Sequence, residues 1–554
     1  MSRNSLLNAP MGFALLFFCG ASQHVIHADD SEYMSRPLAV VASAGLERFE
    51  EDVVRLATVS EHEDLLNIYQ KLKNNINKLP GVDKTRPFGA AIVLRRDILD
   101  SPAGIAFLPV TDGTSLVKSL QQKLPVITDV SDGRWKVKLP KLQLHIHLQD
   151  DYLLISQNEE LLSLVTEDFL AEIQVQTKLN DLYARVDFLG LSEPVRSSFV
   201  RKINNDMKKE EIRKPEESDD EFRLRSQLIE LIKATFLHVV SDSQSLTAGI
   251  QIESEVAVNL HWKAKTDSVL ATQLNHLELD PSKVSLQTNG DAPFQAQLGV
   301  KIPQELQAFL LEAFHLARKQ IKDEIGPQLA EMDRGPLKGA FDALEKTVQR
   351  GDLIATIAFN ESNQNNMILL AGLNIMESDL VKNFLETILP YVRDSEDIQE
   401  VELNFHQSKG LSLHRLQGRN QREEDRRLYG DSASLFVGVS SDRFWIALGD
   451  KQTPDLLEER VQRKGSPNAG QILAIEFSLD PWLVLAEKHQ HDLKKIKMVR
   501  QAIPNAEDDR ITFELKAVPD GLSASLNAQA GYFKLFGIAL KEDQKKNKQR
   551  SKSE

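Results

Sequence analysis

GIQIESEVAVNLHWKAK, residues 249–265, is the stretch that decides the fold class. On either side of the polar segment ESE, apolar and polar side chains alternate. Side chains at every second position of a β-strand point to the same face. The alternation therefore predicts two strands, each with one buried face and one face in water, which is typical of antiparallel sheet. Residues 142–149 (LQLHIHLQ) follow the same pattern.

Helical periodicity is equally clear in other segments. Apolar residues recur at every third or fourth position in residues 47–72, 222–240, 303–321 and 379–389. That spacing places them along one face of a helix. The sequence thus predicts the α+β class, with mainly antiparallel sheets and packed helices.

Four segments of the first half recur in the second half in the same order. Each pair shares a strand, a turn and a helix start, or an alternating hairpin. The pairs are residues 101–122 with 366–388, 151–162 with 442–457, 184–195 with 474–482, and 249–265 with 510–527. The shared order predicts two tandem similar units. The alternative is a single α+β domain whose hairpins resemble one another.

Turn-forming residues (NGDAP, 289–293) separate the two patterned regions. The predicted organisation is a signal peptide (1–28), a first α+β unit (29–290), a second α+β unit (291–541) and a charged disordered tail (542–554). A chain of this length holds enough apolar material for more than one core.

Two internal segments are unusually rich in charge, residues 206–221 (DMKKEEIRKPEESDDE) and 420–427 (NQREEDRR). They have few apolar side chains with which to order themselves. We therefore expect mobile loops there, and no functional sites.

The N-terminus has the order of parts found in export signals: Arg3, an apolar stretch at 11–19, and a polar segment ending at Ala28. The apolar stretch is shorter than a membrane span. We expect cleavage after Ala28 and a periplasmic or extracellular location, the alternative being a buried or interfacial N-terminal helix. Cys19 is the only cysteine, so the mature chain would have no disulfide, thiol nucleophile or cysteine-ligated zinc. No later segment is apolar enough to cross a membrane.

The charge balance is acidic. The formal net charge is −14, and removal of residues 1–28, whose only charged side chain is that of Arg3, leaves −15. Such a chain repels nucleic-acid phosphates. The tail differs, because residues 541–554 carry six basic and three acidic side chains. We expect a solvated end, the alternative being peripheral contact with a membrane or polyanion.

Histidine pairs are the only candidates for a metal site. His145 and His147 lie on one face of a predicted strand, as two metal ligands would. That face is expected to be the wet one, and only Asp150 and Asp151 have a spacing that could complete a ligand set, which favours solvent-exposed side chains over a metal centre. His489 and His491 lie on a predicted helix and face different ways, while Glu487 and His491 share a face that a surface contact explains.

No catalytic or cofactor motif is present. The sequence has no nucleophile elbow, phosphate-binding loop, dinucleotide fingerprint or HExxH helix. Residues 430–434 (GDSAS) come nearest to the elbow but lack its second glycine. We predict no cofactor, although catalytic groups far apart in sequence would escape such a search.

Residues 81–94 (GVDKTRPFGAAIVL) and 103–120 (AGIAFLPVTDGTSLVKSL) resemble the opening of a group of uncharacterised exported proteins of planctomycete-type bacteria. The shared features are an RP-G strand entry and a P-T-D turn before a helix, within residues 38–120. The resemblance implies a periplasmic or extracellular bacterial protein and carries over no catalytic residue.

These patterns favour a non-enzymatic protein that binds or scaffolds an envelope protein or polymer. The alternative is a hydrolase or metal-dependent enzyme without a recognisable motif, which would use the face of His145 and His147.

Overall fold

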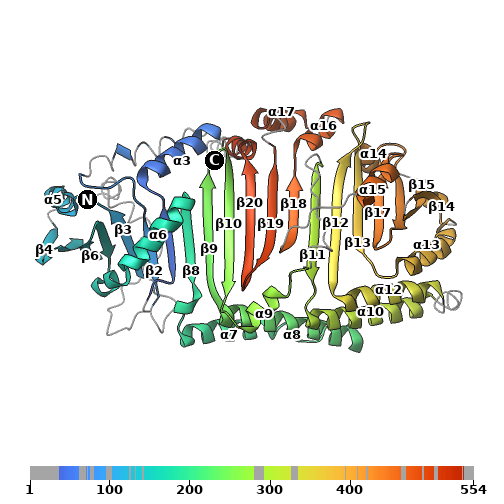
Figure 1. Cartoon of the computed structure of the whole chain (residues 1–554), viewed down its shortest axis with the longest axis horizontal. Coiled ribbons are helices and arrows are strands. Elements are labelled where there is room, and N and C mark those ends of the chain that lie inside the picture. The colour runs from blue at the N-terminus through green and yellow to red at the C-terminus, as the bar shows by residue number, and fades with distance from the viewer. Residues whose placement is uncertain are drawn as a thin grey trace. The chain divides into compact units, whose positions relative to one another are not determined.

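The computed structural model describes residues 36–541 (Figure 1). Outside the description lie 61–65, 67–69, 71–72, 75–79, 95–102, 124–125, 132, 140–141, 280–291, 326–334, 394, 409, 420–421, 463–469, 490–491, 505–508 and 540. The predicted signal peptide with Cys19 and Ala28, most of the boundary at 289–293 and the tail at 542–554 fall outside the described residues. Among the described helices, none has the length and apolar character needed to cross a membrane.

The chain divides into two compact units. Unit 1 comprises Met1–Lys202, Val240–Lys265 and Asn527–Glu554, and unit 2 comprises Ile203–Val239 and Thr266–Leu526.

The sheet of unit 1 is antiparallel throughout. Its strands pair in the order β4-β5-β6-β7-β3-β2-β1-β8-β9-β10. Their bounds are β1 Ala39–Ser43, β2 Phe88–Val93, β3 Ala103–Pro109, β4 Ile127–Ser131, β5 Arg134–Leu139, β6 Leu142–Gln149, β7 Tyr152–Ser156, β8 Leu182–Asp187, β9 Ser243–Ile252 and β10 Glu255–Ala264. The α+β class with antiparallel sheet is confirmed.

Helices cover the two faces of this sheet in different places. The helices are α3 (Leu46–Val59), α5 (Gly113–Lys123), η1 (Glu159–Leu164), α6 (Glu167–Leu179), η2 (Phe188–Gly190) and α7 (Glu193–Met207). Leu116 and Val117 of α5 pack on Val137 and Leu153. On the opposite face, α6 packs against a core that includes Val40 and Phe107.

In unit 2 the strands pair in the order β14-β15-β16-β17-β13-β12-β11-β18-β19-β20. Their bounds are β11 Phe294–Lys301, β12 Asp352–Glu361, β13 Met367–Asn374, β14 Ile398–Ser408, β15 Leu411–Gly418, β16 Ser434–Val439, β17 Arg443–Gly449, β18 Gln471–Phe477, β19 Ile511–Val518 and β20 Gly521–Gln529. The pairings from β14 through β19 are again antiparallel.

Further helices are α8 Asp219–Asp242, α9 Val269–Asn275, α10 Gln304–Ile325, α12 Pro336–Arg350, α13 Ser378–Val392, α14 Glu423–Tyr429, α15 Thr453–Gln462, α16 Asp480–Lys488 and α17 Leu493–Ala502. Local chemistry sets their ends: α12 begins with a proline in its first turn and stops at Gly351 in the left-handed conformation. In the core, α13 packs on β14 and β16 through Val381 and Leu385, and α15 packs on Trp445 through Leu457.

One charged segment differs from its prediction. Residues 423–427 belong to the helix α14, so the expected loop at 420–427 is wrong for the described part of that segment. The segment between α7 and α8 has no regular helix over most of its length, but Arg225 donates hydrogen bonds to the carboxylate of Glu217 (2.6 and 2.8 Å) and to the carbonyl of Ile212 (3.0 Å).

Candidate functional site

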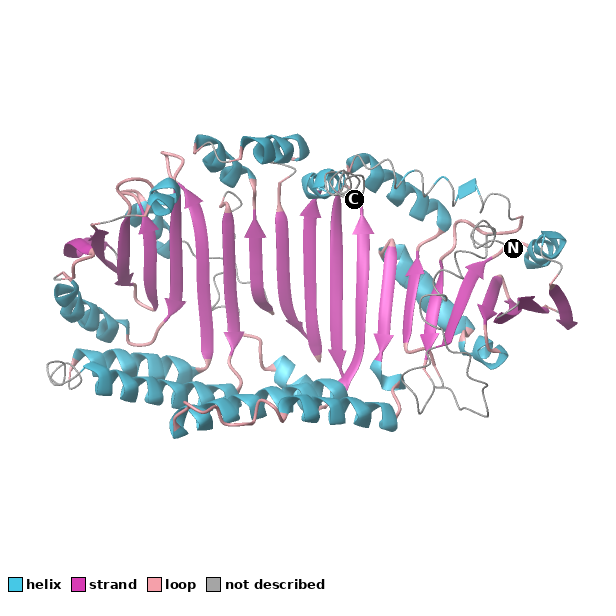
Figure 2. Cartoon of the chain, turned by 180° about the vertical axis from the view of Figure 1, so that it is seen from behind, coloured by secondary structure: helices cyan, strands magenta, loops and turns pink. Residues whose placement is uncertain are grey.

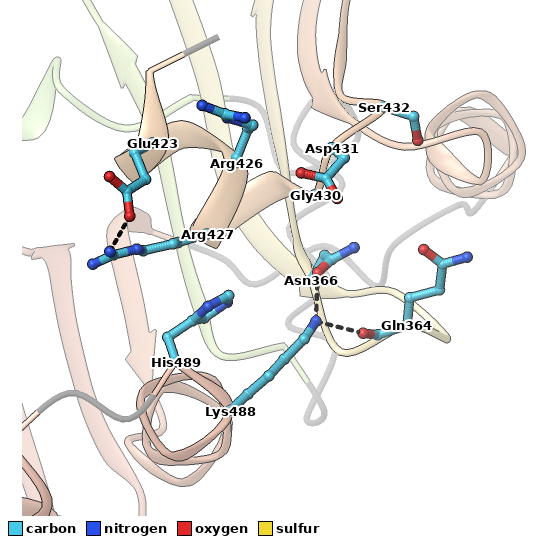
Figure 3. A pocket seen from close by; sticks show the side chains of 10 residues that line it. All are labelled: Gln364, Asn366, Glu423, Arg426, Arg427, Gly430, Asp431, Ser432, Lys488 and His489. Carbon is cyan, nitrogen blue, oxygen red and sulfur yellow. Dashed lines mark hydrogen bonds and ion pairs between the residues drawn. The ribbon is translucent and has the colours of Figure 1, made fainter.

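A pocket of about 540 Å³ opens in unit 2 where three connections meet (Figure 3). They are the turn between β12 and β13, helix α14 with the loop that follows it, and the C-terminal end of α16. The lining residues are Gln364, Asn366, Glu423, Arg426, Arg427, Gly430, Asp431, Ser432, Lys488 and His489. All but the glycine have polar side chains, and none is Phe, Tyr or Trp, so the pocket suits a polar ligand.

The turn between β12 and β13 is built by its own side chains. The Ser362 hydroxyl accepts hydrogen bonds from the backbone N–H groups of Gln364 (3.2 Å) and Asn366 (3.3 Å). Asn365 adopts a positive φ of 54°, which asparagine tolerates better than most residues. This local geometry holds Gln364 and Asn366 at the edge of the pocket.

Lys488 ties α16 to that turn. Its Nζ donates hydrogen bonds to the Gln364 carbonyl (3.0 Å) and to Asn366 Oδ1 (2.8 Å), as the dashed lines in Figure 3 show. Both acceptors are neutral. The ammonium is therefore held in place without any carboxylate partner among the described residues, and its positive charge adds to the field in the pocket.

The C-terminal end of helix α14 is held in place by a buried side chain. Buried Tyr429 packs with Met367 and Leu485, and the helix ends at Gly430, whose φ is +88°. A Cβ on Gly430 would lie 2.5 Å from Asn366 Nδ2. Glycine is required here for both its conformation and its size.

The charges in the pocket are incompletely paired. Arg427 forms an ion pair with Glu423 on the same helix. Arg426 and Asp431 are exposed, and neither makes a hydrogen bond or ion pair through its side chain with another described residue. With Lys488, the pocket holds three permanent cations and two carboxylates, an excess of positive charge in an acidic chain.

His489 follows the last turn of α16. Its backbone N–H donates to the Leu485 carbonyl (3.2 Å), while its Nε2 is buried and has no partner among the described residues. Buried polar atoms almost always have a partner, in the protein or outside it. This nitrogen is therefore available to a ligand or to water.

No protein-family model, curated protein or solved structure matches this chain.

The pocket also contains Asp431, Ser432 and His489, residue types used by hydrolases. Their arrangement differs from a catalytic one, because no hydrogen bond joins Ser432 to His489, and Figure 3 shows the two side chains on opposite sides of the pocket. The segment 430–434 also runs from a helix into a strand, whereas a nucleophile elbow runs from a strand into a helix. Nothing here activates the serine.

The histidines of β6 lie in unit 1. His145 is only 9% exposed; its Nδ1 lies 3.2 Å from Glu159 Oε2, and the Gln143 amide lies 3.0 Å from its Nε2. The expectation of a wet face is wrong for His145, because the start of η1 packs over this strand. Burial lowers the pKa of both His145 and His147. Within the described part of the chain, no group of three or more His, Cys, Asp or Glu side chains is placed to hold a metal ion.

The sequence patterns point to only part of the pocket: they single out His489 and residues 430–434, but they predict a loop where Arg426 and Arg427 lie on α14. His491, the expected partner of Glu487, lies outside the described residues. A signal for α14 was present: three acids in its first turn and two arginines in its last complement the helix dipole.

Proposed function

We propose that this chain is an exported, non-enzymatic binding protein of the bacterial envelope, and that the unit 2 pocket binds an anionic group of its partner. The observation that carries the proposal is the exposed guanidinium of Arg426, a permanent donor, together with the buried Nε2 of His489, which has no partner among the described residues. An arginine fork matches a carboxylate or a phosphate with two parallel hydrogen bonds.

The ligand class follows from the lining. Most small-molecule pockets are mainly apolar, whereas this one has charged and amide side chains and no Phe, Tyr or Trp ring on which a sugar could stack. An acidic polymer segment, bearing carboxylates or phosphates along a polar backbone, matches both the charge and the polarity.

Export is part of the proposal. It rests on Arg3, the apolar stretch at 11–19 and the polar segment that ends at Ala28. N-terminal sequencing of the protein recovered from the envelope fraction should begin at Asp29. A protein that keeps residues 1–28 and stays in the cytoplasm would contradict it.

We also infer that the chain contains two tandem copies of one unit. The support is the order of strand pairing, in which β11 to β20 follow one another as β1 to β10 do. An experimental structure in which the two sets of ten strands superpose would support a duplication, and two sets that do not superpose would refute it.

The binding proposal is tested by titrating the purified chain with polyglutamate, polyphosphate and neutral dextran. We expect binding of at least one polyanion and none of dextran. Arg426→Ala should weaken it about tenfold, since a hydrogen bond to a charged group contributes about 1.5–3 kcal/mol. Arg422→Ala, which removes an equal charge just outside the pocket, is the matched control. If no polyanion binds, or if both variants lose affinity equally, the pocket is not the site.

The second candidate function is a hydrolase, favoured only by the presence of Asp431, Ser432 and His489 in one pocket. A serine-directed fluorophosphonate probe decides between the two. Labelling that disappears in Ser432→Ala would favour the hydrolase, and the absence of labelling in an otherwise folded protein would leave binding as the function.

A further inference from the structure

The side-chain amide of Asn366 has a fixed orientation at the edge of the unit 2 pocket. Asn366 is only 6% exposed, and its Oδ1 accepts a hydrogen bond from Lys488 Nζ (2.8 Å). An ammonium group can only donate, so the amide oxygen must face Lys488 and the amide nitrogen must face the other way. No described residue accepts a hydrogen bond from this Nδ2. A buried donor that lines a pocket and has no partner in the protein is available to a ligand.

Asp431 supplies an acceptor beside this donor. A Cβ on Gly430 would lie 2.5 Å from Asn366 Nδ2, and Asp431 is the next residue in the chain. Figure 3 draws the Asp431 carboxylate on the side of the pocket on which the Asn366 nitrogen lies. Asp431 is exposed, and its carboxylate makes no hydrogen bond or ion pair with another described residue. The pocket therefore presents a donor and an acceptor together.

An unpaired carboxylate is unexpected in a site for a simple anion. Asp431 can only accept hydrogen bonds when it is ionised, and it repels other negative charges. A polyphosphate chain carries no hydrogen-bond donor along its length, so it would leave Asp431 without a partner. The ligand that suits Asp431 carries a donor close to its anionic group.

A peptide group supplies both of the missing partners. In an extended peptide, the N–H and the C=O of one residue point to the same side. The N–H can therefore donate to Asp431 while the C=O accepts from Asn366 Nδ2. An acidic side chain of the same peptide can then reach Arg426, whose guanidinium binds a carboxylate through two parallel hydrogen bonds.

The lining favours a peptide over an acidic sugar, which also carries donors and carboxylates. The pocket has no Phe, Tyr or Trp ring on which a sugar could stack. Two of its lining side chains, Gln364 and Asn366, end in amides. An amide side chain donates and accepts as a peptide group does, so it pairs with one naturally.

The pocket is open enough for a segment of a longer chain. The turn between β12 and β13, helix α14 and helix α16 lie at the same end of the unit 2 strands (Figure 2). Most of the lining side chains are exposed, among them Arg426, Asp431 and Lys488. A polymer can therefore place one residue in the pocket while its two ends continue into solvent.

We propose that the unit 2 pocket binds an acidic peptide segment. Arg426 holds a carboxylate of the peptide, and a neighbouring peptide residue lies between Asn366 Nδ2 and Asp431. This assignment rests on the proposed anion-binding function and names its ligand class. Asn366 and Asp431 are then the residues that distinguish a peptide from other polyanions.

Paired titrations of the purified chain with poly-L-glutamate and with polyacrylate of equal carboxylate number test the proposal. Both polymers carry carboxylates, but only polyglutamate has peptide groups. We expect polyglutamate to bind about tenfold more tightly, because it gains the hydrogen bonds to Asn366 and Asp431.

The variant Asp431→Ala separates the two kinds of site by the sign of its effect. Removing an acid from a site for simple anions would strengthen the binding of both polymers. We expect Asp431→Ala to weaken polyglutamate binding about tenfold and to leave polyacrylate binding no weaker. Glu424→Ala is the matched control, because it removes an exposed acid of α14 that does not line the pocket, and it should leave the ratio of the two affinities unchanged.

Asn366→Asp provides a second variant. It keeps an oxygen for Lys488 but has no Nδ2, so the preference for polyglutamate over polyacrylate should fall to about one. The ratio of affinities is the readout because the added negative charge acts on both polymers alike. Thermal unfolding of each variant checks that the fold is intact.

The outcomes separate this inference from the proposed function. If neither polymer binds the parent chain, both are wrong. If the two polymers bind equally and Asp431→Ala strengthens both, the pocket is an anion site and only the peptide assignment is overturned. If alginate, an acidic sugar polymer, binds as tightly as polyglutamate and is weakened by Asp431→Ala, the ligand is a sugar and the peptide assignment is again overturned.

Discussion

Two equivalent connections of the proposed repeat differ sharply in length. In unit 1, β5 ends at Leu139 and β6 begins at Leu142, whereas in unit 2, β15 ends at Gly418 and β16 begins at Ser434. The longer connection contains α14 and supplies six of the ten residues that line the pocket. A sheet framework can serve both units while an insertion in one of them builds the binding surface, in keeping with the general placement of function on connections.

The histidines of the two units show the same contrast. Both ring nitrogens of His145 have neighbours within hydrogen-bonding distance, whereas His489 Nε2 has none among the described residues. A satisfied buried histidine contributes to the fold, and an unsatisfied one next to a pocket is available for binding. We therefore assign His145 to stability and His489 to recognition.

The largest expected effect concerns a buried acid of unit 1. Burial, together with the negative charge of nearby Asp181, raises the pKa of Asp52 to about 6. Arg48 and Arg55 act in the opposite direction but do not cancel this rise. The folded state thus binds this proton more tightly than the unfolded state, and the free energy of unfolding falls as the pH rises from about 4 to about 6. The Asp52→Asn variant has no carboxyl to ionise here and should not lose this stability. Relative to the parent chain, its free energy of unfolding should therefore be higher at pH 7.5 than at pH 4 by up to about 3 kcal/mol.

Urea denaturation at the two pH values measures this difference. Glu47→Gln, which removes an exposed acid of α3 that is not among the charges acting on Asp52, is the control and should show no gain. If Asp52→Asn and the parent protein were equally stable at pH 7.5, Asp52 would be as well solvated as the charges in the pocket. The contrast between buried groups that determine stability in unit 1 and exposed groups that bind a ligand in unit 2 would then weaken.

The next effect concerns the connection that carries the pocket. Gly430→Ala should lower the free energy of unfolding by about 2 kcal/mol, from left-handed strain plus the contact with Asn366. Gly410→Ala is matched to it, because Gly410 has a φ of +89° and open space where an added Cβ would lie, so about 1 kcal/mol is expected from strain alone.

Polyanion binding separates the two glycine variants further. Gly430→Ala should weaken it, because Asn366 and the Lys488 that it holds must move, while Gly410→Ala should not. Equal costs in stability together with unchanged binding would show that the α14 connection tolerates a side chain and that the close approach is not essential.

The smallest effect compares the two histidines. His145→Ala should lower the free energy of unfolding by about 1 kcal/mol through the loss of its contacts with Glu159 and Gln143, and leave polyanion binding unchanged. His489→Ala should weaken binding at nearly constant stability. Chemical denaturation measures the free energy of unfolding of each variant, and a titration measures its affinity for the polyanion. If His145→Ala lost binding and His489→Ala lost stability, the two assignments would be exchanged.

The sequence allowed part of the fold to be predicted and little of the site. Alternation in residues 249–265 identified the residues that share a face of β9 and β10, because a strand has a period of two. It did not say which face is covered: Leu260 is exposed on the apolar side, and His145 is buried on the expected wet side. Coverage depends on helices that pack from elsewhere in the chain, such as α6 and η1.

The pocket was missed for a related reason. Its residues come from three connections that together span more than 100 positions, so no local motif contains them. Only α14 had a local signal, the acids of its first turn and the arginines of its last. A high density of charge outweighed that signal when residues 420–427 were assigned to a loop.

The most direct test of the central claim is one equilibrium titration of a polyanion, run in parallel on the parent chain, Arg426→Ala and Arg422→Ala. If the unit 2 pocket is an anion-binding site, Arg426→Ala binds about tenfold more weakly and Arg422→Ala binds like the parent chain. Equal affinity in all three proteins would contradict the claim and remove the pocket as the functional site.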